Sequence, residues 1–526
     1  LGHGGCDNCR NRKCEGFLEH WGLSELVPNL GYRNEICAAN DAFLQRERYS
    51  FVTKNDDVEI CCRTDRQPAA SSLTGDMREM TDDILYQQAI RHLAAGRHWQ
   101  AELVARKMLS RDMADPQAWM VRAQYCQRSG NRAGAIAACQ QAGQSAGSRP
   151  DILQALGSLY AGLGLREEAD AVYARLLEAD PENLPGLVNR GNVQLGLGNA
   201  AAAAEYQRRA IALNPGLPEA YYNLASALFH SGKTEQAFDA YEWRWKVSAF
   251  TTRAPDFRQP RWQQGETTDG SLLITPEQGL GDSIHFIRFA GMAKSYFRQV
   301  FAEVPRPLIR LFRDVPGIDG LVPYGGPYPE FDRWAPLLSL PHLMNLKRDS
   351  YPKPPYLSAS GDRSPDRNKE DRLRVGFSWT GNPLSRNNHL RSSTFADFLP
   401  LLHRQDIRPV NLQKDTPPGQ FSHPALREQV TDPMPGVKDF ADTADIISGL
   451  DLVVTVDNVV AHLAGAMGVP VLVLLPTLPD WRWGLTGDRT FWYPSMRLYR
   501  EDRVQGWKSA FAAVEQAISE ITGSSS

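Results

Sequence analysis

The chain has 526 residues, of which 42% are hydrophobic and 23% charged, and its formal net charge at pH 7 is −3. A chain of this length exceeds what one hydrophobic core supports, so we expect roughly three or four domains. The near balance of charge gives no sign of a nucleic-acid or membrane-surface partner. Without a run of about twenty apolar residues, no transmembrane segment is predicted.

Residues 1–80 differ from the rest of the chain, and we expect them to form an irregular Cys-rich or disordered N-terminal segment. Six of the eight cysteines lie in the first 62 residues, and none follows position 139. A disordered tail, or sequence upstream of a natural start at Met77 or Met80, fits this segment best. The competing interpretation is a zinc site with four tetrahedral ligands: Cys6, Cys9, Cys14 and His20.

The compartment is predicted from the same cysteines and from the N-terminus. A secreted protein would spread disulfides through its core, and the N-terminus lacks the pattern of a signal peptide. The bulk of the chain is therefore predicted to be cytoplasmic.

A repeat begins near Ile84. Five glycines recur every 34 residues, and small residues lie seven positions before and five positions after each of them. The glycines are Gly96, Gly130, Gly164, Gly198 and Gly232. This is the period of the tetratricopeptide helix-turn-helix unit, and residues 81–250 resemble such an array of about five repeats, an α-solenoid.

A solenoid of stacked helix pairs offers a concave groove that holds a peptide or a protein. Asn189 and Asn223, each nine residues before a repeat glycine, are candidates to face this groove, although satisfied polar groups on the inner helix are an equal alternative. The array ends in the segment Tyr241–Trp245. Because tryptophans at positions i and i+2 cannot share one helical face, we expect a rigid joint buried on two sides.

The C-terminal half alternates strands with helices. We expect strands at 272–274, 299–304 and 320–324, then a proline-rich bridge from 351 to 365, then strands at 373–379, 408–412, 451–456 and 469–475. Continuous apolar strands such as residues 469–475 are typical of parallel sheets covered by helices. We therefore predict two Rossmann-like lobes, 251–365 and 366–526, with ligands in a cleft beyond the carboxyl ends of the strands.

Chemistry is expected first at the turn after residues 272–274. Gly279 and Gly281 allow a tight turn, which places Asp282 at the start of a helix. Its carboxylate there can cap the helix or act as a general base across the cleft.

The second lobe carries polar residues at its strand ends. Asp457 and Asn458 begin a helix that contains His462, and the free N–H groups and dipole of such a helix suit a diphosphate. His462 or Arg391 could add positive charge there. The alternatives are that His462 is a structural histidine and that Arg391 is a charge on the surface. Lys414 competes with Arg391 for this role.

Several motifs together resemble the bacterial tetratricopeptide-repeat glycosyltransferases, whose catalytic half is similar to the ADP-heptose:lipopolysaccharide heptosyltransferases. The motifs are Gly279–Asp282, Trp379–Pro383 with Arg391–Ser392, Asp439–Ala444, Asp457, Ala461–Ala466, Asp480–Trp483 and Trp492–Pro494. The resemblance implies an α plus α/β chain with a GT-B fold. It also implies a nucleotide-sugar co-substrate held mainly by residues 366–526, with no metal and no cofactor.

Roles carried over from the resemblance make Asp282 the base that deprotonates the acceptor hydroxyl. The acceptor-side loop is then Gln278, Gly279, Gly281 and His285. The donor-binding set is Asn382, Arg391, Ser392, Lys414, Asp457, Asn458 and His462. Two departures affect the donor side: Asn458 stands where the family has Thr, and residues 383–390 lack an expected His and Asp, which leaves donor specificity open.

The leading hypothesis is an inverting, metal-independent glycosyltransferase. It would move a sugar to a hydroxyl of a protein acceptor recruited by the repeats, such as flagellin or another surface protein. One alternative acceptor is a glycan or lipopolysaccharide. The other alternative is a non-catalytic scaffold with a decayed transferase half. The sugar, the nucleotide, the oligomeric state and the role of residues 1–80 stay open.

Overall fold

The computed structural model describes the strands Tyr49–Lys54 and Asp57–Cys62 and the residues 81–359, 372–385, 388–414, 416–417, 419–421, 423–502 and 504–523. The chain divides into two compact units, residues 1–84 and 85–526. In the first unit β1 (Tyr49–Lys54) and β2 (Asp57–Cys62) pair antiparallel, so part of the segment expected to be irregular is a strand pair. The β-branched and aromatic residues in these two segments favour strands. The four zinc candidates lie outside the described residues.

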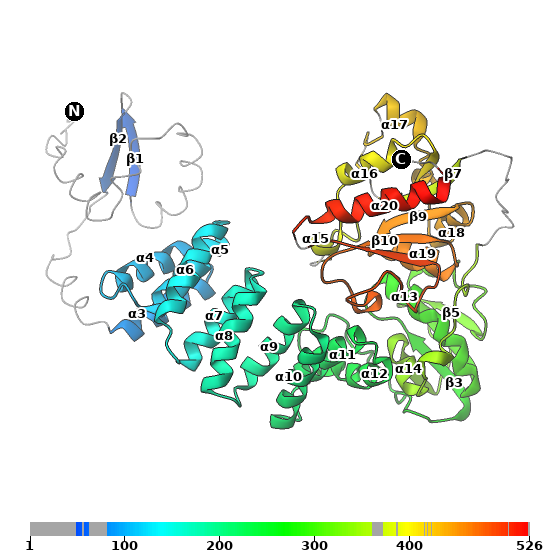
Figure 1. The fold of residues 1–526 in the computed structure, drawn as a ribbon. Coiled ribbons are helices and arrows are strands. Elements are labelled where there is room, and N and C mark those ends of the chain that lie inside the picture. The colour runs from blue at the N-terminus through cyan, green and yellow to red at the C-terminus, as the bar shows by residue number, and fades with distance from the viewer. Residues whose placement is uncertain are drawn as a thin grey trace, which may run out of the picture. The chain divides into compact units, whose positions relative to one another are not determined.

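The second unit begins with five helix pairs (Figure 1). They are α3 (Asp82–Ala94), α4 (His98–Leu109), α5 (Pro116–Arg128), α6 (Arg132–Ser145), α7 (Pro150–Gly162), α8 (Arg166–Ala179), α9 (Leu184–Gly196), α10 (Ala200–Leu213), α11 (Pro218–His230) and α12 (Thr234–Tyr241). From α4 onward each helix packs on the next one, and Ala89 of α3 lies in one hydrophobic cluster with Ala101 and Ala105 of α4. The predicted α-solenoid is confirmed.

The 34-residue period has a backbone cause. All five repeat glycines have a positive φ between 71° and 92°, which side chains with a Cβ rarely adopt. The small residues before them allow close packing: a Cβ at Gly157 would lie 2.7 Å from the ring of Tyr173, and one at Gly191 would lie 2.4 Å from Gln207. The repeat glycines therefore serve the turns, and these neighbours serve the helix contacts.

Replacing Gly164 by Ala is expected to lower the free energy of unfolding of the repeats by about 1–2 kcal/mol, because φ there is +74°. The matched control is Gly143→Ala inside α6, where a Cβ would make an ordinary 3.5 Å contact with Leu156 and should stabilise the helix by about 0.5–1 kcal/mol. Urea denaturation followed by circular dichroism measures both, and equal effects would contradict the prediction.

The first α/β sheet contains four parallel strands in the order β5-β4-β3-β6. The strands are β3 (Thr268–Thr275), β4 (Phe297–Val304), β5 (Gly320–Pro323) and β6 (Arg333–Pro336). The connecting helices are α13 (Leu280–Phe286), the 3₁₀ segments Ile287–Ser295, Arg306–Leu308, Leu337–Ser339 and Arg348–Ser350, and α14 (Leu340–Leu343). The sequence missed β6, because four residues ending in proline show no period.

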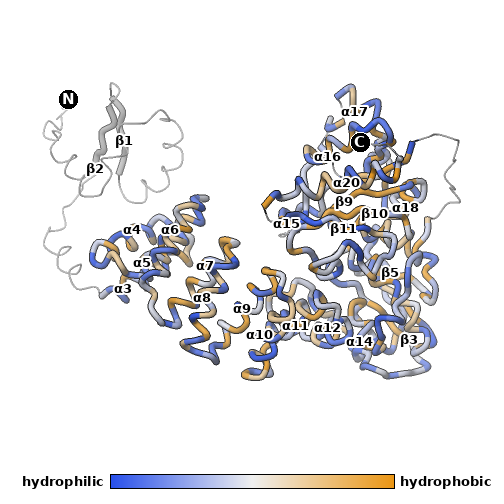
Figure 2. Tube along the Cα trace, viewed as in Figure 1, coloured by the Kyte–Doolittle hydropathy of each residue, from blue (hydrophilic) through white to orange (hydrophobic). Residues whose placement is uncertain are grey.

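The second sheet contains five parallel strands in the order β11-β10-β9-β7-β8. They are β7 (Leu373–Ser378), β8 (Ile407–Asn411), β9 (Leu452–Val456), β10 (Val471–Leu475) and β11 (Met496–Arg500). The helices are α15 (Asn388–Arg391), α16 (Phe395–Leu402), α17 (Pro424–Gln429), α18 (Phe440–Ser448), α19 (Val459–Ala466) and α20 (Trp507–Thr522), with 3₁₀ segments at Met434–Gly436 and Trp481–Trp483. Every residue of β9 and β10 is buried, and both strands are hydrophobic in Figure 2. Two parallel α/β sheets are thus confirmed; the edge strand β11 was missed.

The joint after the repeats is a 3₁₀ helix, Glu242–Lys246, rather than a continued α-helix. Trp243 stacks on Tyr221 of α11 with ring centroids 3.9 Å apart. The fully buried residue is Arg244, which donates to both carboxylate oxygens of Glu277 at 2.8 Å. The segment contacts the array through Trp243 and the first lobe through Arg244, on the two sides expected of it, although both tryptophans are half-buried and an ion pair fills its centre.

One hydrophobic cluster runs through the last repeat and both sheets. It contains Phe238 of α12, Phe286 of α13 and Leu463 of α19. It therefore crosses the expected domain boundaries at 250 and 365. Because α13 packs directly on α19, the two lobes meet around shared apolar side chains.

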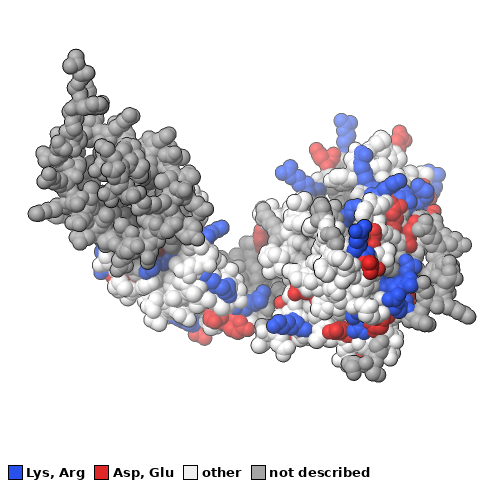
Figure 3. Space-filling model, turned by 90° about the horizontal axis from the view of Figure 1, so that it is seen from above, with Lys and Arg blue, Asp and Glu red and all other residues white. Residues whose placement is uncertain are grey.

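The surface of the second unit adds two observations. On the face drawn in Figure 3, Lys and Arg side chains are interleaved with Asp and Glu. No helix among the described residues has the length and apolar character needed to span a membrane.

Candidate active site

The strand order locates the candidate site. In the first sheet the chain goes from β3 outward to β5 and then returns to β6 on the other side of β3; in the second sheet it does the same between β7 and β9. Ligands of open α/β sheets bind beyond the carboxyl ends of the strands at such switch points. The chain segments that follow β3 and β9 carry the predicted residues Asp282 and Asp457.

These two switch points meet in space. α13 starts shortly after β3 and α19 starts shortly after β9, and the two helices pack together (Figure 1). A Cβ at Gly281 would lie 2.8 Å from Cδ2 of His462, so the close approach depends on glycine. The structure thus brings Gly281, the residue before Asp282, against His462, which lies 181 positions further along the chain.

Asp282 is held from two sides. Its Oδ2 accepts the backbone N–H of Gly279 at 2.9 Å, and its Oδ1 accepts Nη2 of Arg482 in an ion pair. The side chain is 18% exposed. Asp282 therefore caps the start of α13 from its third residue and also faces the other lobe, and its role as a general base stays a prediction.

Arg482 is the centre of a charged cluster to which the sequence analysis assigned no role. Its Nη1 donates to Oδ1 of Asp480 at 2.9 Å, and its guanidinium carbon lies 4.3 Å from the centre of the Trp481 ring. Although burial opposes it, the charge of Arg482 holds the pKa of the Asp480 carboxyl below its ordinary value. Asp480, Arg482 and Asp282 thus form a continuous charged row between the lobes.

The two histidines of the site are neutral. Burial, followed by the charge of Arg482, lowers the pKa of His462 to about 3, and burial holds the pKa of His285 well below its ordinary value. His462 therefore cannot supply the positive charge expected of it, because desolvation disfavours the imidazolium. His285 is fully buried, so its side chain does not line an acceptor-side surface.

Asp457 is a buried carboxyl at the end of β9, with 3% of the residue exposed. Nη1 of Arg391 lies 3.9 Å from its Oδ2. Burial, and then the negative charge of Asp480, raise the pKa of Asp457 from 3.8 to about 6. Arg391 and Arg482 are therefore the cations that neighbour this pair of aspartates.

Asn458 caps α19 and is not free for a ligand. Its Oδ1 accepts the N–H groups of Val460 and Ala461 at 3.0 and 3.2 Å. Its Nδ2 donates to Oγ of Ser378 and to the carbonyl of Thr380. The expectation of free N–H groups at this helix start is corrected for Val460 and Ala461, because the side chain that stands where the family has Thr already satisfies them.

The other donor-side candidates lie around the ends of β7 and β8. Oγ of Ser392 accepts from Oγ1 of Thr380 at 3.0 Å and donates to Oδ1 of Asn388 at 2.9 Å, which fixes the loop. Asn382 is exposed, and its Oδ1 accepts the N–H of Leu384. Lys414 is exposed and donates from Nζ to the carbonyl of Val437 at 3.0 Å. A ligand role for these three residues stays a prediction.

The last repeat contacts both loops of the site. Gln278, with a φ of 60°, donates from Nε2 to the hydroxyl of Tyr241 at 2.5 Å. Phe229 of α11 stacks on Trp481 with ring centroids 4.0 Å apart. Burial, then the charge of Asp480, raises the pKa of Tyr222 in the same helix. The fifth repeat therefore belongs to the surroundings of the site, not only to the solenoid.

The predicted groove residues lie in two different repeats, Asn189 in α9 and Asn223 in α11, the helix that also contacts the site. Asn189 is half-buried in α9 and neighbours the hydroxyl of Tyr173, and Asn223 is half-buried in α11. Their role in peptide binding stays a prediction. Among the residues that the structure describes, no group of three or more His, Cys, Asp and Glu side chains is arranged to hold a metal ion.

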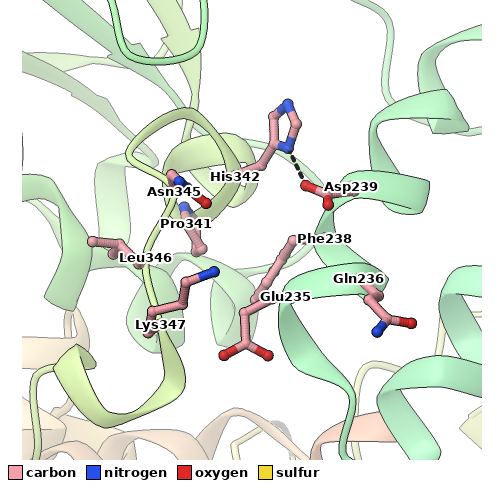
Figure 4. Close-up of a pocket in the computed structure, with 9 residues that line it drawn as sticks. All are labelled: Glu235, Gln236, Phe238, Asp239, Pro341, His342, Asn345, Leu346 and Lys347. Atoms are coloured by element: carbon pink, nitrogen blue, oxygen red, sulfur yellow. Dashed lines mark hydrogen bonds and ion pairs between the residues drawn. The ribbon is translucent and has the colours of Figure 1, made fainter.

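A cavity of about 310 Å³ lies elsewhere, between α12 and the segment from α14 to Lys347 (Figure 4). It is lined by Glu235, Gln236, Phe238, Asp239, Pro341, His342, Asn345, Leu346 and Lys347. Oδ1 of Asp239 pairs with Nδ1 of His342 at 2.7 Å, and Oε1 of Glu235 accepts the N–H of Arg348. Both acidic side chains are thus bonded within the protein, and the cavity includes no residue predicted for the site.

The chain contains tetratricopeptide repeats, and their solenoid is followed by two parallel α/β sheets of Rossmann-like arrangement. The family model of the tetratricopeptide repeat matches residues 155–218 and 188–243. Protein FlbA of Caulobacter vibrioides is 25% identical over 424 residues, which cover 72% of this chain and 69% of that protein. Since the repeats occupy less than this share, the match extends into the α/β half.

Solved structures resemble a smaller part of the chain. PilF of Pseudomonas aeruginosa is 23% identical and covers 31% of this chain and 75% of its own, with a TM-score of 0.28. PilW, a type IV pilus biogenesis factor, is 24% identical and covers 32% and 80%, with a TM-score of 0.29. YrrB, a repeat protein with an unusual peptide-binding site, is 15% identical and covers 31% and 84%, with a TM-score of 0.27.

Sequence reasoning left Asp480, Arg482 and Tyr493 without roles. All three lie in the motifs Asp480–Trp483 and Trp492–Pro494, which carry part of the resemblance. The sequence contains a pattern that could have indicated these residues: in Asp480–Trp483, charged residues alternate with tryptophans shortly after a buried strand. Large aromatic rings are rarely left exposed in a loop, so such a segment is expected to pack against the rest of the protein. What the sequence did not contain is the partner of each side chain.

Proposed function

We propose that the chain is a glycosyltransferase that moves a sugar from a nucleotide sugar to a hydroxyl of a protein acceptor held by the repeats, by inverting single displacement without a metal. The observation that carries the proposal is the meeting of the two switch points, where Asp282, Asp457 and Asp480 converge with Arg391 and Arg482. Such a transfer needs a negatively charged base and positive charge near the leaving group, and this cluster contains both.

The chemistry assigns the two signs as follows. A base takes the proton of the acceptor hydroxyl while its oxygen attacks the anomeric carbon, and the bond to the nucleoside diphosphate breaks with the electron pair leaving on phosphate. Cations in a partly buried site stabilise that negative charge far better than they would in water. Asp282 is the proposed base, and Arg482 with Arg391 are the proposed cations.

The ion pair between Asp282 and Arg482 implies an order of events. While Arg482 holds Asp282, Oδ1 of the carboxylate is occupied by the ion pair and is not free to take a proton from an acceptor hydroxyl. A diphosphate would compete with Asp282 for Arg482, and its arrival would release the carboxylate for the acceptor. The nucleotide sugar is thus expected to bind before the protein acceptor.

Replacing Asp282 by Asn tests this mechanism. Transfer should fall by about 10²–10⁴-fold, the usual contribution of a general base, while binding of the nucleotide sugar stays equal or strengthens because Arg482 is freed. The exposed Asp314, in the connection between β4 and β5, provides the control variant, Asp314→Asn. Transfer is measured by product mass spectrometry and binding by calorimetry; unchanged transfer in Asp282→Asn removes this residue from the mechanism.

The repeats are proposed to select a protein acceptor. Asn189→Ala combined with Asn223→Ala should raise the KM for a protein acceptor and leave hydrolysis of the nucleotide sugar without acceptor unchanged. If the acceptor is instead a glycan or a lipopolysaccharide, the double variant transfers the sugar to it like the wild type, which overturns the recruitment step.

A non-catalytic scaffold is the second candidate, and two observations favour it. The lobes share a hydrophobic cluster, and Asp282 is bonded from both sides. Calorimetry of the full chain with UDP-, GDP-, ADP- and CMP-sugars separates the candidates. Absence of binding to all four classes supports the scaffold.

A further inference from the structure

The turn that precedes Asp282, residues 277–279, has an unusual backbone at its centre. Gln278 has a φ of 60°, and among the residues that the structure describes only Asn345 also has a positive φ without being glycine. Gln278 directly follows a buried glutamate and directly precedes Gly279, whose N–H donates to Oδ2 of Asp282 at 2.9 Å. A residue with a Cβ keeps such a φ only when its surroundings hold it there.

Two hydrogen bonds hold Gln278, and both come from outside the first sheet. Its side-chain Nε2 donates to the hydroxyl of Tyr241, the last residue of α12, at 2.5 Å. Its backbone N–H donates to Oγ1 of Thr252 at 3.1 Å, in the segment that joins the repeats to β3. Gln278 itself is exposed, so packing contributes little to its conformation. The positive φ therefore depends on these two contacts.

The ring of Tyr241 is fixed within the fifth repeat. The residue is 7% exposed, and its ring lies 5.8 Å from that of Tyr222 and 5.9 Å from that of Phe229, centroid to centroid. The guanidinium carbon of Arg244 lies 4.5 Å from the ring centre, and Arg244 also binds Glu277 at the start of the turn. The Tyr241 hydroxyl is therefore a rigid point to which the turn is attached.

The same repeat also holds the loop of the second lobe. Phe229 of α11 stacks on Trp481 with ring centroids 4.0 Å apart, and Nε2 of His230 lies 3.2 Å from the carbonyl oxygen of Pro479. These contacts come directly before Arg482, the cation that pairs with the proposed base. The fifth repeat thus contacts both chain segments from which this ion pair is built.

We infer that Tyr241 is a positioning residue for the proposed base: through Gln278 it fixes the turn 277–279, from which Asp282 is presented to the second lobe. Glycine at position 278 would adopt this φ without help, whereas glutamine needs a partner, and the fifth repeat supplies it. That repeat is then part of the catalytic unit. The role of Asp282 rests on the proposed function, but the attachment of the turn to Tyr241 does not.

Hydrogen exchange of the full chain, followed by mass spectrometry of peptides that cover the turn 277–279, tests this attachment without any ligand. Tyr241→Phe keeps the ring and removes the hydroxyl, so exchange at the turn should accelerate about fivefold, the equivalent of one hydrogen bond. The control is Tyr206→Phe, whose ring is half-buried in α10 of the fourth repeat and which should leave the turn unchanged. Equal exchange in Tyr241→Phe and the wild type overturns the inference.

Two substitutions at Gln278 separate positioning from a general loosening of the protein. Both Gln278→Ala and Gln278→Gly remove the bond to Tyr241, but only glycine adopts a positive φ readily. Gln278→Ala should therefore accelerate exchange at the turn by about fivefold or more over Gln278→Gly. Adding Tyr241→Phe to Gln278→Gly should change nothing further, since the two groups act as one pair. A further acceleration in that double variant overturns the inference.

Transfer kinetics connect the turn to the site. Tyr241→Phe and Gln278→Ala should each lower kcat by about tenfold and leave the KM for the nucleotide sugar unchanged, because the turn presents the base and not the donor-binding residues. Gln278→Gly should recover most of the lost kcat. A loss confined to KM overturns the positioning of the base. If the wild type transfers no sugar, the proposed function fails, and the exchange result still decides whether Tyr241 holds the turn.

Discussion

Replacing Arg244 by Met is expected to lower the free energy of unfolding by about 3–5 kcal/mol, because it leaves the buried carboxylate of Glu277 without its cation. Arg244 donates to both oxygens of Glu277 at 2.8 Å, to Oε1 of Glu242 at 2.9 Å and to Oγ of Ser339 at 2.8 Å. Burial raises the pKa of Glu277 even with Arg244 in place. Loss of the guanidinium therefore exposes a desolvation penalty that the ion pair now offsets.

The double variant Arg244→Met with Glu277→Gln distinguishes charge from packing. A neutral glutamine can still accept the N–H of Leu338, which now donates to Oε1 of Glu277 at 2.9 Å, so most of the lost stability should return. Arg149→Met provides the control, since Arg149 and Asp151 are both more than half exposed and such pairs contribute about 0–1 kcal/mol. Urea denaturation of the full chain measures all of these. An Arg244→Met midpoint equal to that of Arg149→Met would contradict the prediction.

Replacing Asp457 by Asn is expected to stabilise the protein at pH 7.5 by about 2–3 kcal/mol, since a difference of one in pKa corresponds to about 1.4 kcal/mol. The pKa of Asp457 is raised from 3.8 to about 6, so only between these two pH values does the folded chain keep a proton that the unfolded chain has lost. At pH 7.5 the buried carboxyl is ionised in the folded chain, and its desolvation costs stability. The stability linked to this neutral carboxyl is present below about pH 4 and is lost as the pH rises to 6. Asparagine cannot ionise and keeps its stability throughout.

The stability of Asp457→Asn and of the wild type, measured over a series of pH values, can contradict this prediction. The difference between Asp457→Asn and the wild type should be small at pH 4.5 and reach its full value above pH 7. Asp502 is the matched control with the opposite sign: hydrogen bonds from the N–H groups of Gln505 and Val504 lower its pKa, so Asp502→Asn should lose stability at pH 7.5. Denaturation midpoints at five pH values measure both, and a difference for Asp457→Asn that does not change with pH contradicts the prediction.

The repeats could be predicted from the sequence because their cause is local. Each repeat glycine meets a backbone requirement, a positive φ, that no neighbour in space has to supply. The buried strands β9 and β10 were equally readable, since a strand covered on both faces needs a continuous apolar run. By contrast, β6 and β11 were missed, because a short strand at the edge of a sheet is defined by its pairing, with β3 and β10 respectively, more than by its own residues.

The candidate site was predicted as positions and not as contacts. Asp282, Asp457 and His462 were recognised from motifs, and they do lie around one cluster. The free helix start at Asn458 and the positive charge of His462 were wrong, because capping and desolvation depend on what surrounds a side chain. The motif alone shows neither which N–H groups are capped nor how far a side chain is buried.

The sequence by itself determined the solenoid, the two parallel sheets and the positions of the polar strand ends, since these follow from local periodicity and turn chemistry. Only the tertiary structure decided that Arg482 binds Asp282, that Arg244 seals Glu277 against the last repeat and that Tyr493 bridges two histidines. These partners are 200, 33 and 208 residues apart. Their charge and proton positions depend on burial, which arises only when the repeats and both sheets close around one core.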